Sequence, residues 1–231
     1  MAISVVDYCS PTAAADFAAS LHETGFGVLI NHPIPESLVR SIFERWLDFF
    51  QNGDKEGLAF SSERFDGYFS TAVSETAKGE TVKDFKEFYH VYPWGRVPEH
   101  LRAEAMDYYA QASALAAELL SWVQQYTPPD ISQFYSQPLS SMIEGSQQTL
   151  LRVLHYPPLT GDEPEGSVRA AAHGDINLLT VLPAANAPGL QVLAKDGTWM
   201  EVPCDFGMLI INTGDMLQEA SRGYYPSTIH R

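Results

Sequence analysis

Three residues of this sequence, His173, Asp175 and His230, have the side-chain types and spacing of a metal site. On a β-strand, residues two apart point to the same face, so His173 and Asp175 would aim at one point, with only Gly174 between them. His230, supplied by a distant strand, would complete a face of two imidazoles and one carboxylate. This ligand set is typical of non-haem Fe(II) oxygenases, because it leaves open positions on the metal. The alternative is a strand histidine and a turn aspartate that bind no metal.

The second half of the chain supplies the strands that would position these ligands. From residue 149, short apolar runs alternate with turn residues, which favours an antiparallel β-sandwich or barrel. The expected strands are TLLRVLHY, VRAAAH, LLTVL, GLQVLA, WMEVP, GMLIINT and STIHR. Lys195-Asp196-Gly197 is expected to form a hairpin turn, because an Asp-Gly pair tolerates positive φ.

The first half of the chain predicts mainly helices. The expected elements are strands at 3–7 and 27–30 and helices at 10–23, 35–51 and 98–126. The first helix would start with Ser10 as its N-cap and Pro11 at its first position, and it would end near Gly25. The second helix carries an aromatic stripe, including Trp46 and Phe50, that we expect to lie in the core.

Several different short motifs follow one another along the chain. The stretch from Arg169 to Arg231 contains HxD…LLT, GLQV, G-x-W-x-x-V-P, NTGD-x-LQ and S-x-x-HR. Further motifs upstream are ETGFGVLINHPIP from residue 23, RFDGYF from 64, DFKEFYHV from 84 and LLRVLHYPPL from 150. With these motifs, the chain resembles the isopenicillin-N-synthase-like family of 2-oxoglutarate/Fe(II)-dependent dioxygenases over nearly its whole length.

The resemblance implies a fold as well as an activity. We expect an α+β chain with a double-stranded β-helix (jelly-roll) core and flanking N-terminal and central helices. Residues 1–231 would form a single oxygenase domain. Its helix-rich N-terminal part, with the first strands, would cover 1–148, and the jelly-roll core would cover 149–231.

The resemblance also implies the cofactor and the reaction. Fe(II) would be held by His173, Asp175 and His230, with 2-oxoglutarate as co-substrate and molecular oxygen as oxidant. Decarboxylation would give succinate and carbon dioxide, coupled to hydroxylation, desaturation or ring closure at an unactivated C–H bond. The iron would supply this chemistry, and the protein would bind and orient the reactants and shield them from solvent.

Two residues are candidates for contact with the co-substrate. Tyr156 matches the tyrosine whose hydroxyl helps to hold 2-oxoglutarate in many relatives, and a packed strand-end tyrosine is the alternative. Arg152 could pair with an acidic substrate or co-substrate, or it could be a solvated strand arginine. The family also has an R-x-S motif about a dozen residues beyond the second histidine. The sequence ends at Arg231, so we expect a natural chain that continues and carries this motif.

The substrate pocket is expected in the N-terminal part, because the family places its G-Y and K-E-x-F elements near the iron. The candidate pocket residues are Phe65, Tyr68, Phe69, Phe88 and His90. An equally plausible interpretation is that they pack the rim of the jelly roll.

The composition of the chain indicates which binding partners and which cellular compartment to expect. With a net charge of −15, the chain lacks the basic clusters that phosphate binding needs, so nucleic acid is not an expected partner. Two cysteines are too few for a disulfide framework, and the N-terminus has no basic region of a signal peptide. No apolar run approaches the ~20 residues that span a bilayer. We therefore expect a cytoplasmic protein, monomeric or weakly dimeric, that acts on a small molecule.

Two other functions stay open at this point. An oxidase of the same fold would use Fe(II) and oxygen without 2-oxoglutarate, as some members of the family do. A catalytically inactive scaffold would keep the oxygenase fold and bind metal without catalysing a reaction. Succinate formation coupled to oxygen uptake would separate the three hypotheses.

Overall fold

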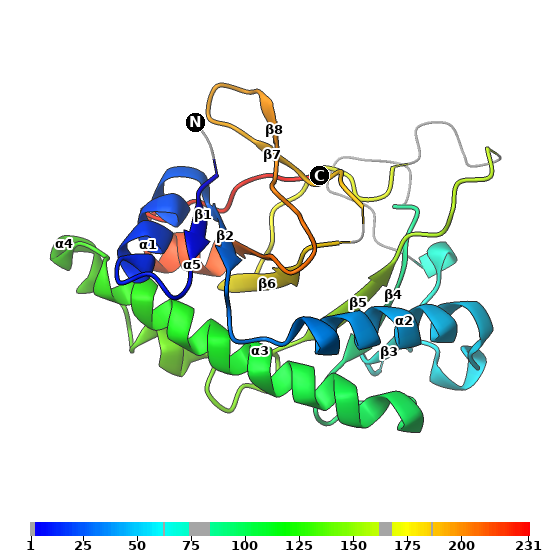
Figure 1. Cartoon of the computed structure of the whole chain (residues 1–231). Helices are drawn as coiled ribbons and strands as arrows, with labels where there is room; N and C mark the ends of the chain where they lie inside the picture. Colours follow the sequence, from blue (N-terminus) through cyan, green and yellow to red (C-terminus); the bar gives the residue numbers. More distant parts are fainter. Residues whose placement is uncertain (1–2, 62, 74–83, 162–167, 186) are drawn as a thin grey trace. The chain divides into compact units, whose positions relative to one another are not determined.

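The structure, a computed structural model, describes residues 3–61, 63–73, 84–161, 168–185 and 187–231. The chain divides into two compact units, whose elements are labelled in Figure 1. The first unit comprises residues 1–34, 112–144 and 173–231, and the second comprises residues 35–111 and 145–172.

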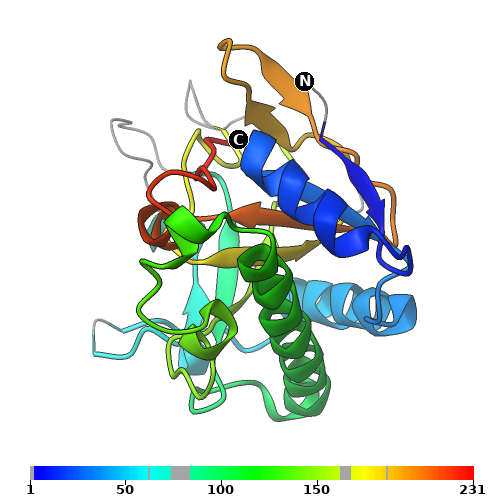
Figure 2. The same ribbon diagram turned by 90° about the vertical axis from the view of Figure 1, so that its left-hand side faces the viewer.

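The first unit is built on a four-stranded sheet. Its strands, in spatial order, are β1 (Val5–Asp7), β2 (Phe26–Ile30), β9 (Leu209–Thr213) and β6 (Leu179–Pro183). The β1–β2 pair is parallel, and the β2–β9 and β9–β6 pairs are antiparallel. Helix α1 (Ala13–Thr24) packs along β1 and β2, as Figure 2 shows.

The two ends of α1 differ in how well they were predicted. Its C-terminus is confirmed: Gly25 has a φ of 72° and donates its N–H to the Leu21 carbonyl, a left-handed cap that suits glycine. The start at Ser10 was wrong: Ser10 lies in a turn, where its N–H is bound to the Asp7 carbonyl and its own carbonyl accepts from Ala13. The cap is Thr12, and the helix begins at Ala13, two residues after the expected Pro11.

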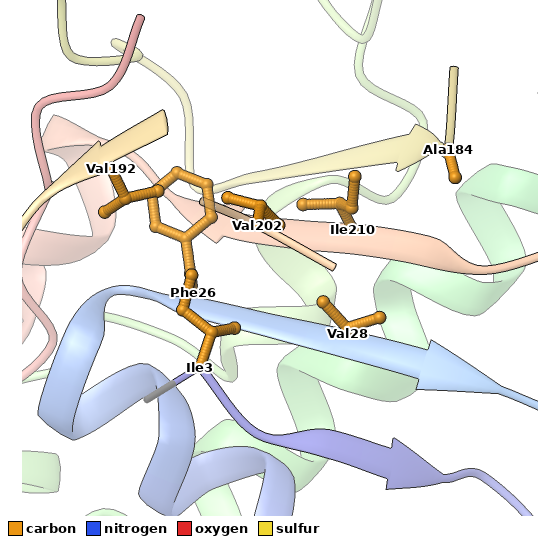
Figure 3. Packing of buried hydrophobic residues seen from close by; sticks show 7 residues of the cluster. All are labelled: Ile3, Phe26, Val28, Ala184, Val192, Val202 and Ile210. Carbon is orange, nitrogen blue, oxygen red and sulfur yellow. The ribbon is translucent and has the colours of Figure 1, made fainter. Parts of the chain in front are cut away.

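A buried apolar cluster lies on one face of this sheet. Its members are Ile3, Phe26, Val28, Ala184, Val192, Val202 and Ile210, shown in Figure 3. Phe26 and Val28 are two apart on β2 and therefore share a face, and Ile210 is the register partner of Val28 on β9. Val192 comes from the hairpin of β7 (Gln191–Leu193) and β8 (Trp199–Glu201), so the cluster ties that hairpin to the main sheet. Each Val, Ile or Phe side chain of the cluster contributes about 1.5–3 kcal/mol on burial.

The predicted hairpin turn at Lys195-Asp196-Gly197 is confirmed. It joins β7 to β8, Gly197 has a φ of 85°, and its N–H is bound to the Ala194 carbonyl. Glycine is favoured at this left-handed position of a three-residue hairpin loop.

The second unit holds a three-stranded antiparallel sheet, β3 (Gly67–Phe69), β4 (Glu87–Val91) and β5 (Leu151–His155), in that order. Helix α2 (Glu36–Asn52) covers one face of it. The aromatic stripe of α2 is confirmed as core. Trp46 is 1% exposed, its ring centroid lies 5.1 Å from that of Tyr89, and the Phe50 ring stacks on His155.

Helix α3 (Glu99–Gln125) begins in the second unit and ends in the first, close to its expected bounds. The remaining helices are α4 (Pro129–Ser132), α5 (Asp215–Ala220) and the short 3-10 segments Glu56–Leu58, Thr71–Val73 and Leu139–Met142. Among the residues that the structure describes, no helix has the length and apolar character to cross a membrane.

Two expected strands are absent from the described chain. Neither the VRAAAH nor the STIHR segment forms a regular strand, and His230 makes isolated bridges with His173 and with Val192. Beside the Val192 bridge, Gln191 and Arg231 exchange both main-chain hydrogen bonds and the Leu193 N–H donates to the Ile229 carbonyl. The last three residues of STIHR therefore lie against β7. The mixture of helices with short, mostly antiparallel strands agrees with the expected α+β class.

Candidate metal centre

A pair of main-chain hydrogen bonds brings two histidines together from distant parts of the sequence. The His173 N–H donates to the His230 carbonyl at 3.0 Å, and the His230 N–H donates to the His173 carbonyl at 2.9 Å. Residues that exchange both bonds in this way are directly opposite each other, with side chains on the same side. Their ring centroids are accordingly 4.4 Å apart.

Asp175 completes the cluster. The Nε2 atoms of His173 and His230 lie 3.9 and 3.8 Å from the Asp175 Oδ1 atom. One potential ligand atom from each residue lies within 4.8 Å of the others. The structure therefore brings together all three residues that the spacing predicted, although Asp175 lies outside any strand.

The ring of His230 is oriented by its neighbours. Its Nδ1 atom lies 3.1 Å from the Thr228 carbonyl, which can only accept, so Nδ1 carries the proton and Nε2 offers a lone pair. Phe26 packs edge-on against the ring at 5.4 Å. Burial lowers the pKa of His230 below its usual value, against the opposing effect of Asp175, so the imidazole stays neutral as a ligand must.

The second oxygen of Asp175 is held by two donors. The Asn212 Nδ2 atom donates to Oδ2 at 2.8 Å, and the Thr180 hydroxyl makes a short hydrogen bond to the same oxygen. Burial would raise the pKa of Asp175, but these two bonds and the nearby histidines outweigh it and keep the carboxyl group ionised.

The backbone of Asp175 is anchored by the start of α5. The Asp215 N–H donates to the Asp175 carbonyl at 2.7 Å. Gly214 makes this approach possible, since a Cβ there would lie 2.2 Å from the Asn177 carbonyl oxygen and 2.8 Å from that of Asp175. The NTGD motif thus contacts Asp175 at both its side chain and its main chain.

Two family models match the chain. The 2OG-Fe(II) oxygenase superfamily matches residues 147–231, and the non-haem dioxygenase in morphine synthesis N-terminal family matches residues 3–112. Flavanone 3-dioxygenase 2 of Oryza sativa subsp. japonica is 30% identical over 242 residues, which cover 99% of this chain and 68% of the relative. The chain belongs to the 2-oxoglutarate/Fe(II)-dependent dioxygenases.

Solved structures agree. A Shewanella oneidensis protein described as an oxygenase is 55% identical, with a TM-score of 0.91 over 100% of this chain and 82% of that one. A full-length Neurospora crassa protein, solved in complex with alpha-KG, shares the fold at 22% identity, with a TM-score of 0.80 over 99% of this chain and 78% of its own. The chain spans 62% of another relative, the Arabidopsis thaliana protein DMR6-LIKE OXYGENASE 2. Fe(II), 2-oxoglutarate and oxygen are the metal and co-substrates of this dioxygenase.

The predicted co-substrate residues of the dioxygenase lie in its second unit. Tyr156 follows β5 and is 38% exposed, with the Arg169 guanidinium 5.7 Å from its ring centre. Arg152 lies on β5, where its Nε atom donates to His90 Nε2 at 3.0 Å and its guanidinium lies over the Phe88 ring.

The five candidate pocket residues divide between two faces of the β3-β4-β5 sheet and its rim. Phe69 stacks on Phe88 at 4.6 Å, and His90 shares their face by strand alternation. Tyr68 lies on the opposite face, towards α2, where its hydroxyl donates to Glu87. Phe65, in the preceding loop, is 62% exposed.

A cavity of about 740 Å³ lies beside this sheet, lined by Glu63, Arg64, Phe65, His90, Tyr92, Trp94 and Gln148. Phe65 and His90 therefore line this cavity, and the other three candidates are not among its lining residues. Tyr92 and Trp94, which the sequence did not single out, stack on each other at 4.7 Å.

Sequence reasoning did not assign Asn212 or Thr180 to the site. Both belong to motifs noted in the sequence, NTGD and LLT. The motifs were therefore the available signal, but the partner of each side chain depends on the pairing of β6 with β9. Arg231, the neighbour of His230, lies over the Trp199 ring and donates to Gln191.

Proposed function

We propose that this dioxygenase holds one Fe(II) through His173, Asp175 and His230 and oxidises a C–H bond of a small molecule. The observation that carries the proposal is the convergence of two imidazole nitrogens and one carboxylate oxygen within 4.8 Å. This donor set fits Fe(II) and leaves part of the coordination sphere to other ligands. When bound, the iron would supply oxidation coupled to conversion of 2-oxoglutarate into succinate and carbon dioxide.

The protein's part is to hold the ligands ready. The Thr228 carbonyl keeps the proton of His230 on Nδ1, so that Nε2 faces the cluster. Asn212 and Thr180 keep Asp175 ionised. Both effects favour the deprotonated forms that a metal needs at neutral pH.

The test is to measure succinate release and oxygen uptake together with Fe(II) and 2-oxoglutarate. A 2-oxoglutarate-dependent oxygenase should produce succinate in step with oxygen consumption. Oxygen uptake without succinate would indicate the oxidase. The absence of both oxygen uptake and succinate would indicate an inactive scaffold. His173→Ala is the matched control, because it removes one ligand and leaves the rest of the chain unchanged.

We further propose that Tyr156 and Arg152 contact 2-oxoglutarate. The exposed position of Tyr156 at the end of β5 supports its availability. Loss of a hydrogen bond to a charged group is worth roughly 1.5–3 kcal/mol, so Tyr156→Phe should raise the required 2-oxoglutarate concentration about tenfold or more. Tyr126→Phe, another exposed tyrosine, is the control. A change confined to the binding of the primary substrate would assign Tyr156 to a different pocket.

The substrate pocket is proposed around Phe65, Phe69, Phe88 and His90, with Tyr68 behind them in the sheet. The cavity lined by Phe65 and His90 supports this, since its volume of about 740 Å³ suits a small molecule. His90 is held at both ring nitrogens, by the Phe65 carbonyl at 3.0 Å and by Arg152. It would therefore present a fixed wall to a substrate.

Two structural expectations also remain proposals. The antiparallel pairing of β2, β9 and β6 and the likeness to the Neurospora crassa structure support a jelly-roll core within one oxygenase domain, with 1–148 as its N-terminal part and 149–231 as its core. The acidic composition supports a monomer or weak homodimer that binds no nucleic acid.

A further inference from the structure

We propose that Asn212 and Thr180 are positioning residues that determine which oxygen of Asp175 is offered to the metal. This inference rests on the proposed function of the three-residue centre. The two oxygens of Asp175 are in different environments: Oδ2 accepts from Asn212 at 2.8 Å and from the Thr180 hydroxyl, whereas Oδ1 faces the two histidine Nε2 atoms at 3.8 and 3.9 Å.

The direction of these hydrogen bonds is determined by chemistry. An ionised carboxylate only accepts, so the side chain of Asn212 must turn its amide nitrogen towards Oδ2. Asn177 donates from Nδ2 to the Thr180 oxygen at 2.9 Å. Because that oxygen accepts from Asn177, the single hydroxyl proton of Thr180 is left for Asp175. Asn177, Thr180 and Asp175 therefore form a chain with one direction.

The two donors are held together by the main sheet. Thr180 on β6 and Asn212 on β9 are register partners, so their side chains project from the same face next to each other. Asn212 is 3% exposed, which restricts its side chain to this contact. The sheet thus presents two donors at one point, while α5 holds the main chain of Asp175.

This arrangement favours a carboxylate that binds through one oxygen. If Oδ2 were released, the carboxylate could rotate and offer both oxygens, and a second oxygen would occupy a position that a co-substrate needs. Partners of this kind, one layer behind the ligands, typically change metal affinity 10–100-fold. We therefore expect Thr180→Val and Asn212→Ala each to weaken Fe(II) binding by about that factor.

The experiment compares anaerobic Fe(II) affinity among folded variants, with Co(II) as an air-stable probe whose visible spectrum reports the ligand geometry. Thr180→Val should weaken binding and change the Co(II) spectrum, and Thr180→Ser, which restores the hydroxyl, should recover both. Thr127→Val is the matched control, since it removes a buried hydroxyl that donates to the Val123 carbonyl instead. Its affinity and spectrum should equal those of the unmodified protein.

Two outcomes would overturn the inference in distinguishable ways. If the unmodified protein and His173→Ala bind Fe(II) equally, the proposed function itself fails. If His173→Ala loses the metal but Thr180→Val and Asn212→Ala keep unchanged affinity and an unchanged Co(II) spectrum, the centre stands and the positioning role is wrong. Should Asn212→Ala fail to fold, the Val and Ser variants of Thr180 decide the question alone.

Discussion

Asp175 in the first unit and Asp66 in the second each accept hydrogen bonds from two side chains, but the donors are distributed differently. Each oxygen of Asp66 accepts from both Arg64 and Arg96, over 3.2–3.3 Å. At Asp175, both donors reach Oδ2, and Oδ1 faces two imidazoles. The donors of Asp66 are cations that neutralise it, whereas those of Asp175 carry no charge. A carboxylate is available to a metal when its donors are neutral and leave one oxygen open.

The largest effect is expected from exchanging these two carboxylates for amides. Asp175→Asn should abolish stoichiometric Fe(II) binding, because the charge and the open oxygen are lost together, and His173→Ala should do the same. Asp66→Asn should keep one Fe(II) per chain. The measurement is iron per folded protein after anaerobic loading and desalting. Undiminished iron in Asp175→Asn would remove the distinction between the two carboxylates.

A second effect should appear in stability. Burial would raise the pKa of Asp66, but the hydrogen bonds from Arg64 and Arg96 outweigh it and hold the pKa at about 2, compared with an ordinary 3.8. The folded state therefore binds its proton more weakly than the unfolded state, which contributes about 2 kcal/mol above the ordinary pKa. This contribution should be lost as the pH falls from about 4 to about 2.

Urea unfolding across that pH window measures this contribution. Asp66→Asn should be less stable than the unmodified protein at neutral pH, and the difference should shrink in acid. A constant difference at every pH would show that packing, and not the charge of Asp66, causes the loss.

The smallest effect concerns a histidine that resembles His230 in one respect. His32 also has one nitrogen at a backbone carbonyl, Gly207, at 2.9 Å, and its buried Nδ1 atom has no hydrogen-bond partner among the described residues. Burial lowers the pKa of His32 below its ordinary 6.5. The unfolded state therefore gains the proton first, and stability should fall as the pH drops below about 6.5.

His32→Gln should keep a donor for Gly207 and remove the titration. The slope of unfolding free energy against pH should then be shallower below about 6.5. Fe(II) affinity should not change, since His32 does not belong to the cluster of potential metal ligands found among the described residues. An unchanged slope would mean that His32 titrates alike in both states.

The elements that depend on local chemistry were predictable from the sequence. The stripe of Trp46 and Phe50 defined α2, and Gly25 defined the end of α1, since spacing and backbone preference act within a few residues. The ligand triad was predicted by the assumption that Asp175 lies on a strand, which it does not. The predicted ligand set was nevertheless brought together, because contacts from α5 and from the sheet, and not a strand, position Asp175.

The donors behind Asp175 were not predictable by the same reasoning. Asn212 and Thr180 meet because β6 and β9 pair in one register, and a shift of one residue would turn either side chain to the other face. Such a contact depends on the whole sheet. The start of α1 was wrong for a different, local reason: Ser10 lies in a turn that Asp7 opens, and two candidate caps, Ser10 and Thr12, stand close together.

The paired main-chain bonds of His173 and His230 also close a long loop, residues 174–229, that contains the hairpin and two strands of the main sheet. Closing a loop of that length costs roughly 3–4 kcal/mol of chain entropy beyond a constant term. A metal ion bound by both His173 and His230 would cross-link the two ends of this loop. Iron binding should then make local unfolding of the whole segment rarer, including β7 and β8. Amide hydrogen exchange far from the ligands would therefore report whether the metal cross-links the loop.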